Sequence, residues 1–314
     1  MPRVSLPDRL ILGFNPLLGV DHYLRERARD PQRVRSMEQV LDVVQEAVRS
    51  GARGFNLNAG PEAARLLHAL SERGLAHEVG LYPMVPDERF FGTLLNQGTM
   101  GAVSAIMSGL SLRGKTKALM SGGWAYLTDD PFRGVTTYLD IEVERLNRAS
   151  RGIGTVRTVL VHELITDALV GLGATDAFGQ FVDRVHSRCN LPAGFVTRNF
   201  VRFAEYAKQA GVDPRTLVVL TPVNPVGFQM APDRLTVERE LALLGGENVI
   251  AMSVFGAGMV PVTDALAYLC RIRGIRSVAV GVSTVEHART TFPRLHEVVE
   301  SQKGRDGTNQ FRSD

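Results

Sequence analysis

Eight short runs of apolar, mostly β-branched residues recur along the chain, and stretches with helical spacing separate them. The runs are continuously apolar rather than alternating, which is typical of strands buried on both faces. Eight strand-then-helix units close into a barrel whose functional residues lie at the carboxyl ends of the strands. We therefore predict one (β/α)8 TIM barrel of class α/β, with strands at 10–15, 54–58, 77–82, 157–162, 193–198, 217–224, 249–253 and 277–283.

Amphipathic segments between these runs predict the covering helices. The segment 37–50 repeats apolar residues at helical spacing, and Gly51 follows it as a stop signal. The segments 200–210, 234–244 and 263–272 show the same pattern.

Two stretches depart from this spacing. The connection between the third and fourth strands is far longer than a plain unit needs, so we predict a helix at 142–148 and a long insertion after strand 3, at about 86–133. The insertion is rich in Gly and aromatic residues, including Trp124, and is either a lid over the carboxyl-end face or a helical addition at the side. The barrel with its insertion takes up residues 1–300, and the polar, aperiodic residues 301–314 predict a disordered tail.

Composition narrows the class of protein. With 44% hydrophobic and 22% charged residues, the chain resembles an ordinary soluble globular protein. No apolar run is long enough for a membrane span and the N-terminus lacks a secretory pattern, so we expect a cytoplasmic protein without a membrane partner. The net charge is +3, but the arginines are dispersed, so we expect a small-molecule substrate and no nucleic acid. The oligomeric state is left open.

Two further chemistries find no support in the sequence. Cys189 and Cys270 are isolated, and no His-x-His or clustered carboxylate spacing occurs, so we expect no metal site. None of the four lysines ends a predicted strand, which disfavours a Schiff-base aldolase.

Polar residues at the strand ends are the candidates for the site. Strand alternation directs Asn56 and Asn58 into the barrel and Leu57 toward the helices. The same alternation directs the side chains of His162 and Glu163 to opposite faces of the strand, unless the strand ends between them. The predicted mouth collects Asn15, Asn56, Asn58, Tyr82, His162, Glu163, Arg198, Asn199, Asn224, Ser253 and Ser283.

His162 and Arg198 carry the most specific chemistry. A histidine titrates near neutral pH, so His162 is the expected proton carrier; the alternative is a structural histidine. The guanidinium group of Arg198 has the fork geometry that binds a carboxylate or phosphate. The alternative interpretation is that Arg198 is an ordinary arginine on a surface loop.

Four asparagines and the loop after the first predicted strand supply the residues that we expect to bind substrate. Asn15, Asn58, Asn199 and Asn224 orient a polar substrate, although turn formation before proline explains Asn15 and Asn224 equally well. Asp21 and His22 form a second candidate acid–base pair, and Trp124 is expected to wall the pocket.

The order of these motifs resembles that of the aldo-keto reductase superfamily. The similar segments are LGFNPLLG (12–19), GARGFNLNA (51–59), IEVERLNR (141–148), LVHE around His162, GFVTRNF, TPVNP, SVFGAG and VAVGVSTVEH. The resemblance covers roughly residues 10–295 apart from the insertion. It implies an aldo-keto-reductase-like barrel and a reductase that uses a nicotinamide cofactor.

The family's catalytic set of Tyr, Asp, Lys and His is matched only in part. His162 stands at the position of the histidine, whereas Asn56 replaces the aspartate. No tyrosine lies between Phe55 and Leu81, and the third strand carries Tyr82 but no lysine. The resemblance places a cofactor phosphate at Ser253, Gly256, Gly258, Ser283 and Thr284, with Arg289 close to the adenine position, so NADP(H) binding is left open.

Three functions follow from these observations. The first is an enzyme in which the four catalytic residues of the reductases are only partly kept. It performs isomerase, epimerase or lyase chemistry on a small oxygenated, anionic substrate, and the expected catalytic residues are His162, Tyr82 and Asn56. The second is an NAD(P)H-dependent reductase with a rearranged acid, either Tyr82 or Tyr23. The third is a non-catalytic ligand-binding barrel.

Overall fold

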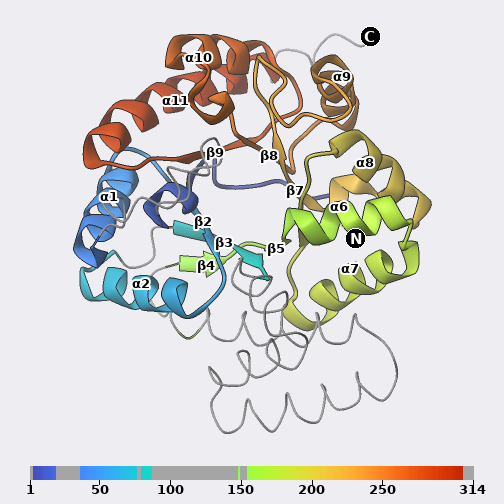
Figure 1. Cartoon of the computed structure of the whole chain (residues 1–314), viewed down its shortest axis with the longest axis horizontal. Coiled ribbons are helices and arrows are strands. Elements are labelled where there is room, and N and C mark those ends of the chain that lie inside the picture. Colours follow the sequence, from blue (N-terminus) through green and yellow to red (C-terminus); the bar gives the residue numbers. More distant parts are fainter. Residues whose placement is uncertain (1–2, 19–35, 76–78, 87–147, 149–153, 307–314) are drawn as a thin grey trace, which may run out of the picture.

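Eight parallel strands form one closed ring in the computed structural model, which describes residues 3–18, 36–75, 79–86, 148 and 154–306 (Figure 1). The ring runs β1, β2, β3, β5, β6, β7, β8, β9 and back to β1. The predicted closed barrel, with its first strand starting at Leu10, is therefore confirmed. The strands are β1 (Leu10–Gly13), β2 (Gly54–Asn58), β3 (Val79–Val85), β5 (Val159–Val161), β6 (Ala193–Val196), β7 (Val218–Pro222), β8 (Val249–Met252) and β9 (Ser277–Gly281), with β4 (Gly154–Val156) paired to β3 outside the ring.

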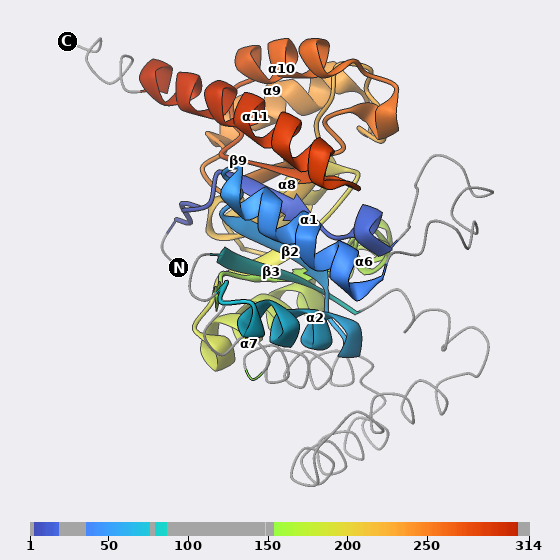
Figure 2. The same ribbon diagram turned by 90° about the vertical axis from the view of Figure 1, so that its left-hand side faces the viewer.

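Helices surround the ring, as Figures 1 and 2 show. In α1, Ser36 and Gln39 exchange side-chain and backbone hydrogen bonds of 3.3 and 3.0 Å, so the first turn is capped as the sequence pattern requires. The predicted helices at 37–50, 200–210, 234–244 and 263–272 are confirmed within one residue at each end. The helices are α1 (Met37–Arg49), α2 (Pro61–Glu72), α6 (Glu163–Leu172), α7 (Thr175–Cys189), α8 (Phe200–Gln209), α9 (Arg234–Leu244), α10 (Val262–Arg271) and α11 (Val285–Asp306).

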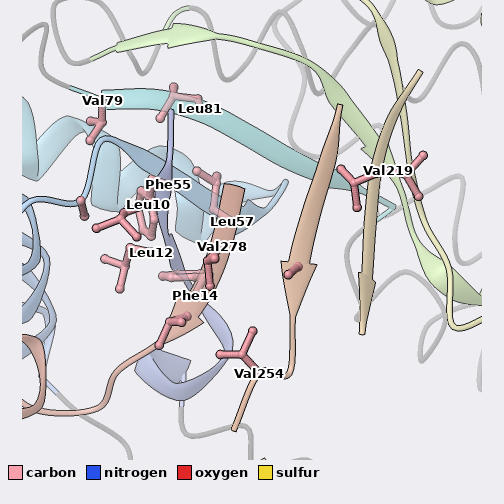
Figure 3. Close-up of a cluster of buried hydrophobic side chains, with 14 of the residues drawn as sticks. Leu10, Leu12, Phe14, Phe55, Leu57, Val79, Leu81, Val219, Val254 and Val278 are labelled. Carbon is pink, nitrogen blue, oxygen red and sulfur yellow. The ribbon is translucent and has the colours of Figure 1, made fainter. Parts of the chain in front are cut away.

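The core has two layers, one between the strands and the helices and one inside the barrel. Leu10, Leu12, Phe55 and Leu57 belong to the outer layer (Figure 3), whereas Ile11 packs inside the ring. Side chains therefore alternate along each strand as expected. This alternation decides which residues near the strand ends face the barrel axis.

Several strand ends differ from the sequence prediction. The third strand was predicted at 77–82, but β3 runs from Val79 to Val85, so Tyr82 lies in its middle. β5 ends at Val161 and β6 at Val196, before the predicted ends at 162 and 198. α11 runs to Asp306, and the predicted disordered tail at 301–314 stays a prediction.

A polar cluster closes the amino end of the barrel. The Tyr82 hydroxyl donates a 2.7 Å hydrogen bond to Asp8 Oδ2, and Arg157 Nε donates to the same oxygen at 3.2 Å. Ser277 Oγ donates to the Asp8 carbonyl at 2.6 Å. Gly80 is required beside this cluster, because a Cβ there would lie 2.1 Å from Asp8 Oδ2. These groups fill the end opposite to the expected site.

The predicted helix at 142–148 and the insertion at about 86–133 fall almost wholly outside the described residues. In the described part of the chain, no helix is long and apolar enough to cross a bilayer.

Candidate active site

His162 follows β5 directly and caps the N-terminus of α6. Its Nδ1 atom accepts the backbone N–H of Leu164 at 3.2 Å, and its own backbone N–H donates to the Val85 carbonyl at 2.7 Å. The residue is buried, at 5% exposure. It lies one residue beyond the end of β5, the strand whose Leu160 packs inside the barrel.

The contact with Leu164 assigns the tautomer of His162. A neutral imidazole carries one donor and one acceptor nitrogen, so an accepting Nδ1 leaves the proton on Nε2. Protonation of Nδ1 would turn the acceptor into a donor facing another donor and add a positive charge at a helix N-terminus. In this tautomer the ring presents Nε2–H as a hydrogen-bond donor.

Glu163 and Arg198 form an ion pair over the ends of β5 and β6. Arg198 Nη2 donates to Glu163 Oε1, and the Glu163 side chain is only 17% exposed. His162 and Glu163 sit in the turn after β5 rather than on the strand, so strand alternation does not separate them. The positive charge of Arg198 is balanced by Glu163, which weakens its predicted role as a clamp for an anionic substrate.

The backbone of Arg198, in the loop after β6, contacts helix α6 and the loop after β7. Its N–H donates to Asp167 Oδ2 at 3.3 Å, and its carbonyl accepts from Ala231 N at 3.0 Å. Asp167 also accepts the Thr197 hydroxyl at 2.6 Å. Burial raises the pKa of the Asp167 carboxyl, and these two hydrogen bonds offset part of that effect.

Asn56 and Asn58 lie on the inward side of β2, because Phe55 and Leu57 pack in the outer layer. Asn56 Nδ2 donates to the Tyr82 carbonyl at 2.9 Å on the neighbouring strand. Asn58 is buried beside Met84 at the carboxyl end of the β2–β3 pair. Of the two amides, Asn58 is the one nearer to the barrel mouth.

The structure places Tyr82 away from the mouth. Its hydroxyl is bound to Asp8 at the amino end, and burial raises the pKa of the Tyr82 phenol, with the Asp8 charge adding to the effect. The interpretation of Tyr82 as a strand-end acid is therefore wrong, because β3 extends three residues beyond it.

Two asparagines predicted to bind substrate have structural hydrogen bonds instead. Both amide atoms of Asn224 bind Phe228, accepting its N–H at 2.8 Å and donating to its carbonyl at 2.9 Å. Asn199 Oδ1 accepts the Arg202 N–H at 3.3 Å and caps α8. For Asn224 the structural explanation, that the asparagine stabilises a turn, therefore accounts for its position better than substrate binding does.

Other predicted substrate residues are not described. Asn15 begins the short helix η1 (Asn15–Leu18), and its side chain lies outside the description, as do Asp21, His22, Tyr23 and Trp124. The lid hypothesis also falls on residues outside the described part. These assignments stay predictions.

The residues assigned to a cofactor phosphate are largely engaged in local structure. The N–H groups of Gly256 and Gly258 donate to the Ser253 and Phe255 carbonyls at 2.8 and 2.9 Å. The backbone N–H groups of both glycines, which were predicted to bind a phosphate, are therefore used within the turn itself.

The side chains at the start of α11 are engaged as well. Thr284 Oγ1 accepts the His287 N–H at 3.1 Å, and Ser283 Oγ lies 3.3 Å from His287 Nδ1. Arg289 pairs with Glu46 on α1 at 3.2 Å and with Glu286 at 3.6 Å. As they stand, these residues do not fit a nicotinamide cofactor.

Sequence reasoning missed the connection of Glu163, Asp167 and Arg198. The spacing of Glu163 and Asp167, one helical turn apart, places both on one side of α6 and was available in the sequence. Their partner Arg198, in the segment after β6, was not, because it depends on which strand lies next to β5.

Comparisons with known proteins support the fold. No family model and no curated protein matches the chain. PA4992 of Pseudomonas aeruginosa, assigned to the aldo-keto reductases, superposes with a TM-score of 0.54 at 13% identity, covering 93% of this chain and 90% of that one. The aldo-keto reductase AKR11C1 of Bacillus halodurans gives 0.51 at 10%, covering 94% and 91%. The chain therefore has the (β/α)8 barrel fold of the aldo-keto reductases.

Proposed function

We propose that this chain is an aldo-keto-reductase-like barrel enzyme that performs isomerase, epimerase or lyase chemistry on a small carbonyl compound without hydride transfer. The observation that carries the proposal is the Nδ1 contact of His162 with Leu164 N, which leaves Nε2–H as the donor at a strand end. Such a donor stabilises the negative charge that develops on a carbonyl oxygen during enolisation. The anionic substrate expected from Arg198 is not retained, since Glu163 balances that charge.

A reductase is the second candidate, supported by the names of the solved structures that share the fold. Its general acid finds no counterpart among the described tyrosines. Tyr82 faces the amino end, Tyr268 on α10 donates to Glu238 at 2.8 Å, and Tyr206 packs on α8 outside the ring. Of the two tyrosines suggested for that acid, Tyr23 lies outside the described residues and stays a candidate.

Exchange of carbon-bound hydrogen tests the proposed function directly. The protein is incubated in D2O with a panel of small aldehydes, ketones and hydroxycarbonyls, without cofactor, and loss of the α-proton is followed by NMR. We expect exchange with at least one compound. His162→Asn keeps an oxygen that caps α6 but removes the Nε2 donor, and we expect it to lower the rate about 10²–10³-fold.

His68→Asn is the matched control, because His68 is an exposed histidine on the outer face of α2. It should leave exchange unchanged. Absence of exchange with every compound, or equal rates for wild type and His162→Asn, would contradict the proposal.

A further inference from the structure

The proposed enolisation needs a base, and His162 in its described geometry does not supply one. A neutral imidazole accepts a proton only at the nitrogen without hydrogen, which here is Nδ1, and that atom faces Leu164 N. The base must therefore be another group at the carboxyl end of the barrel.

Glu163 is the carboxylate next to His162. β5 ends at Val161 and α6 begins at Glu163, so both side chains start from the same turn. The Glu163 side chain is mostly buried and reaches the end of the neighbouring strand β6, where it meets Arg198. It therefore lies across the strand ends rather than along the outer surface of α6.

Only one oxygen of Glu163 is engaged. Arg198 Nη2 binds Oε1, and among the described residues no donor lies within hydrogen-bond distance of Oε2. The Arg198 side chain is 42% exposed, so the ion pair opens to solvent on one side. A free carboxylate oxygen beside an open face is the arrangement that a base requires.

The surrounding loops hold this carboxylate in place. Arg198 is fixed by its backbone contacts with Asp167 and Ala231, and Asp167 is fixed by Thr197. Asp167 and Arg198 are thus positioning residues: they act on Glu163 and, through it, on the substrate.

We propose that Glu163 is the base that removes and returns the α-proton of the carbonyl substrate, an inference that rests on the proposed function. Glu163 Oε2 takes the proton from the α-carbon, and the C–H electron pair forms the new C=C bond. The carbonyl π pair moves to the oxygen, where the His162 Nε2–H stabilises it. The proton then returns from Glu163 to the same α-carbon while the electron pair on oxygen re-forms the C=O bond and the C=C pair forms the new C–H bond, so the step needs no oxidant, reductant or leaving group.

The test compares Glu163→Gln with Asp213→Asn, a carboxylate of the same kind at the amino end, where Arg215 Nη2 binds it at 2.7 Å. Glu163→Gln keeps an oxygen for Arg198 but removes the basic group. We expect its kcat for α-proton exchange in D2O to fall at least 10²-fold with little change in KM, whereas Asp213→Asn keeps the wild-type rate.

Glu163→Ala with added formate separates a base from a structural ion pair and keeps the test open if the glutamine variant does not fold. We expect formate to restore exchange in a saturable way in this variant and to leave His162→Asn unchanged. Exchange by Glu163→Gln at the wild-type rate would overturn the inference while the proposed function stands. Absence of exchange in the wild type would overturn both.

Discussion

The hydroxyl of Tyr82 donates a 2.7 Å hydrogen bond to the carboxylate of Asp8 inside the amino end of the barrel. This contact joins the segment before β1 to the middle of β3, and Arg157 completes it from the segment before β5. Residues at the amino end of such barrels serve stability rather than catalysis. Substitution of Tyr82 therefore tests whether the amino end of this barrel contributes to stability and not to activity.

Tyr82→Phe is expected to lower the free energy of unfolding by about 1–3 kcal/mol, because a fully buried hydrogen bond to a charged group is lost. Urea unfolding at pH 7 measures this. The rate of α-proton exchange should stay that of the wild type. A variant of unchanged stability but lower activity would return Tyr82 to the active site.

The stability of the protein should also fall in alkali through Tyr82. Burial raises the pKa of its phenol above the ordinary value of 10.0, so the unfolded chain ionises first. The free energy of unfolding is therefore unaffected below pH 10 and decreases as pH rises above it. In Tyr82→Phe this decrease should be smaller, as unfolding curves at pH 9 and pH 11 would show.

Asp213 should make the free energy of unfolding decrease at low pH, whereas Tyr82 makes it decrease at high pH. The hydrogen bond from Arg215 lowers the pKa of this carboxyl from 3.8 to about 2, so it stabilises the folded state above pH 3.8 and loses that effect as pH falls toward 2. Arg215→Met should lower the free energy of unfolding only slightly at pH 7, since solvent screens the pair. If the cost persists at pH 2, the ion pair is not its source.

Asn224→Ala tests the structural role of an asparagine that the sequence suggested for substrate binding. Its side chain is fully buried and satisfies both backbone groups of Phe228, so its removal should destabilise the protein by about 1–3 kcal/mol per unpaired group. Amide hydrogen exchange should show faster exchange at Phe228. Unchanged protection there would leave a substrate contact as the better explanation.

Carbonyl reduction is expected to be absent. A general acid contributes about 10²–10⁴ in rate, and no described tyrosine occupies the barrel mouth. Incubation with NADPH and simple aldehydes, followed by absorbance of the reduced cofactor, measures this. Turnover of about 1–10³ per second, the usual range for enzymes, would restore the reductase hypothesis.

The fold was predictable because its signal is repeated eight times. Errors concern single strand ends, where local pattern is weakest: Tyr82 was placed at the end of a strand because the pattern gave no reason to extend it through Pro83. Parallel pairing with β2, which matches Asn58 to Met84, and with β5, which matches Val85 to Val161, sets the true end. Such pairing is a long-range property that a single run of residues does not carry.

The site was predictable only in part. Strand alternation, a local rule, directs Asn56 and Asn58 inward, and the outer-layer packing of Phe55 and Leu57 agrees with that rule. The glycines after β8 were assigned as phosphate donors from their type, but their N–H groups are used within the turn that they form. The role of His162 also depends on a contact with Leu164, two residues further along, that exists only once α6 has formed.

The tautomer of His162 tests the central claim most directly. A long-range ¹H–¹⁵N spectrum of the histidine rings at neutral pH, assigned by the signal that disappears in His162→Asn, reports which nitrogen carries the proton. We predict a neutral ring with hydrogen on Nε2 and an unprotonated, hydrogen-bonded Nδ1. A ring protonated at Nδ1, or one that is positively charged at neutral pH, would contradict the account.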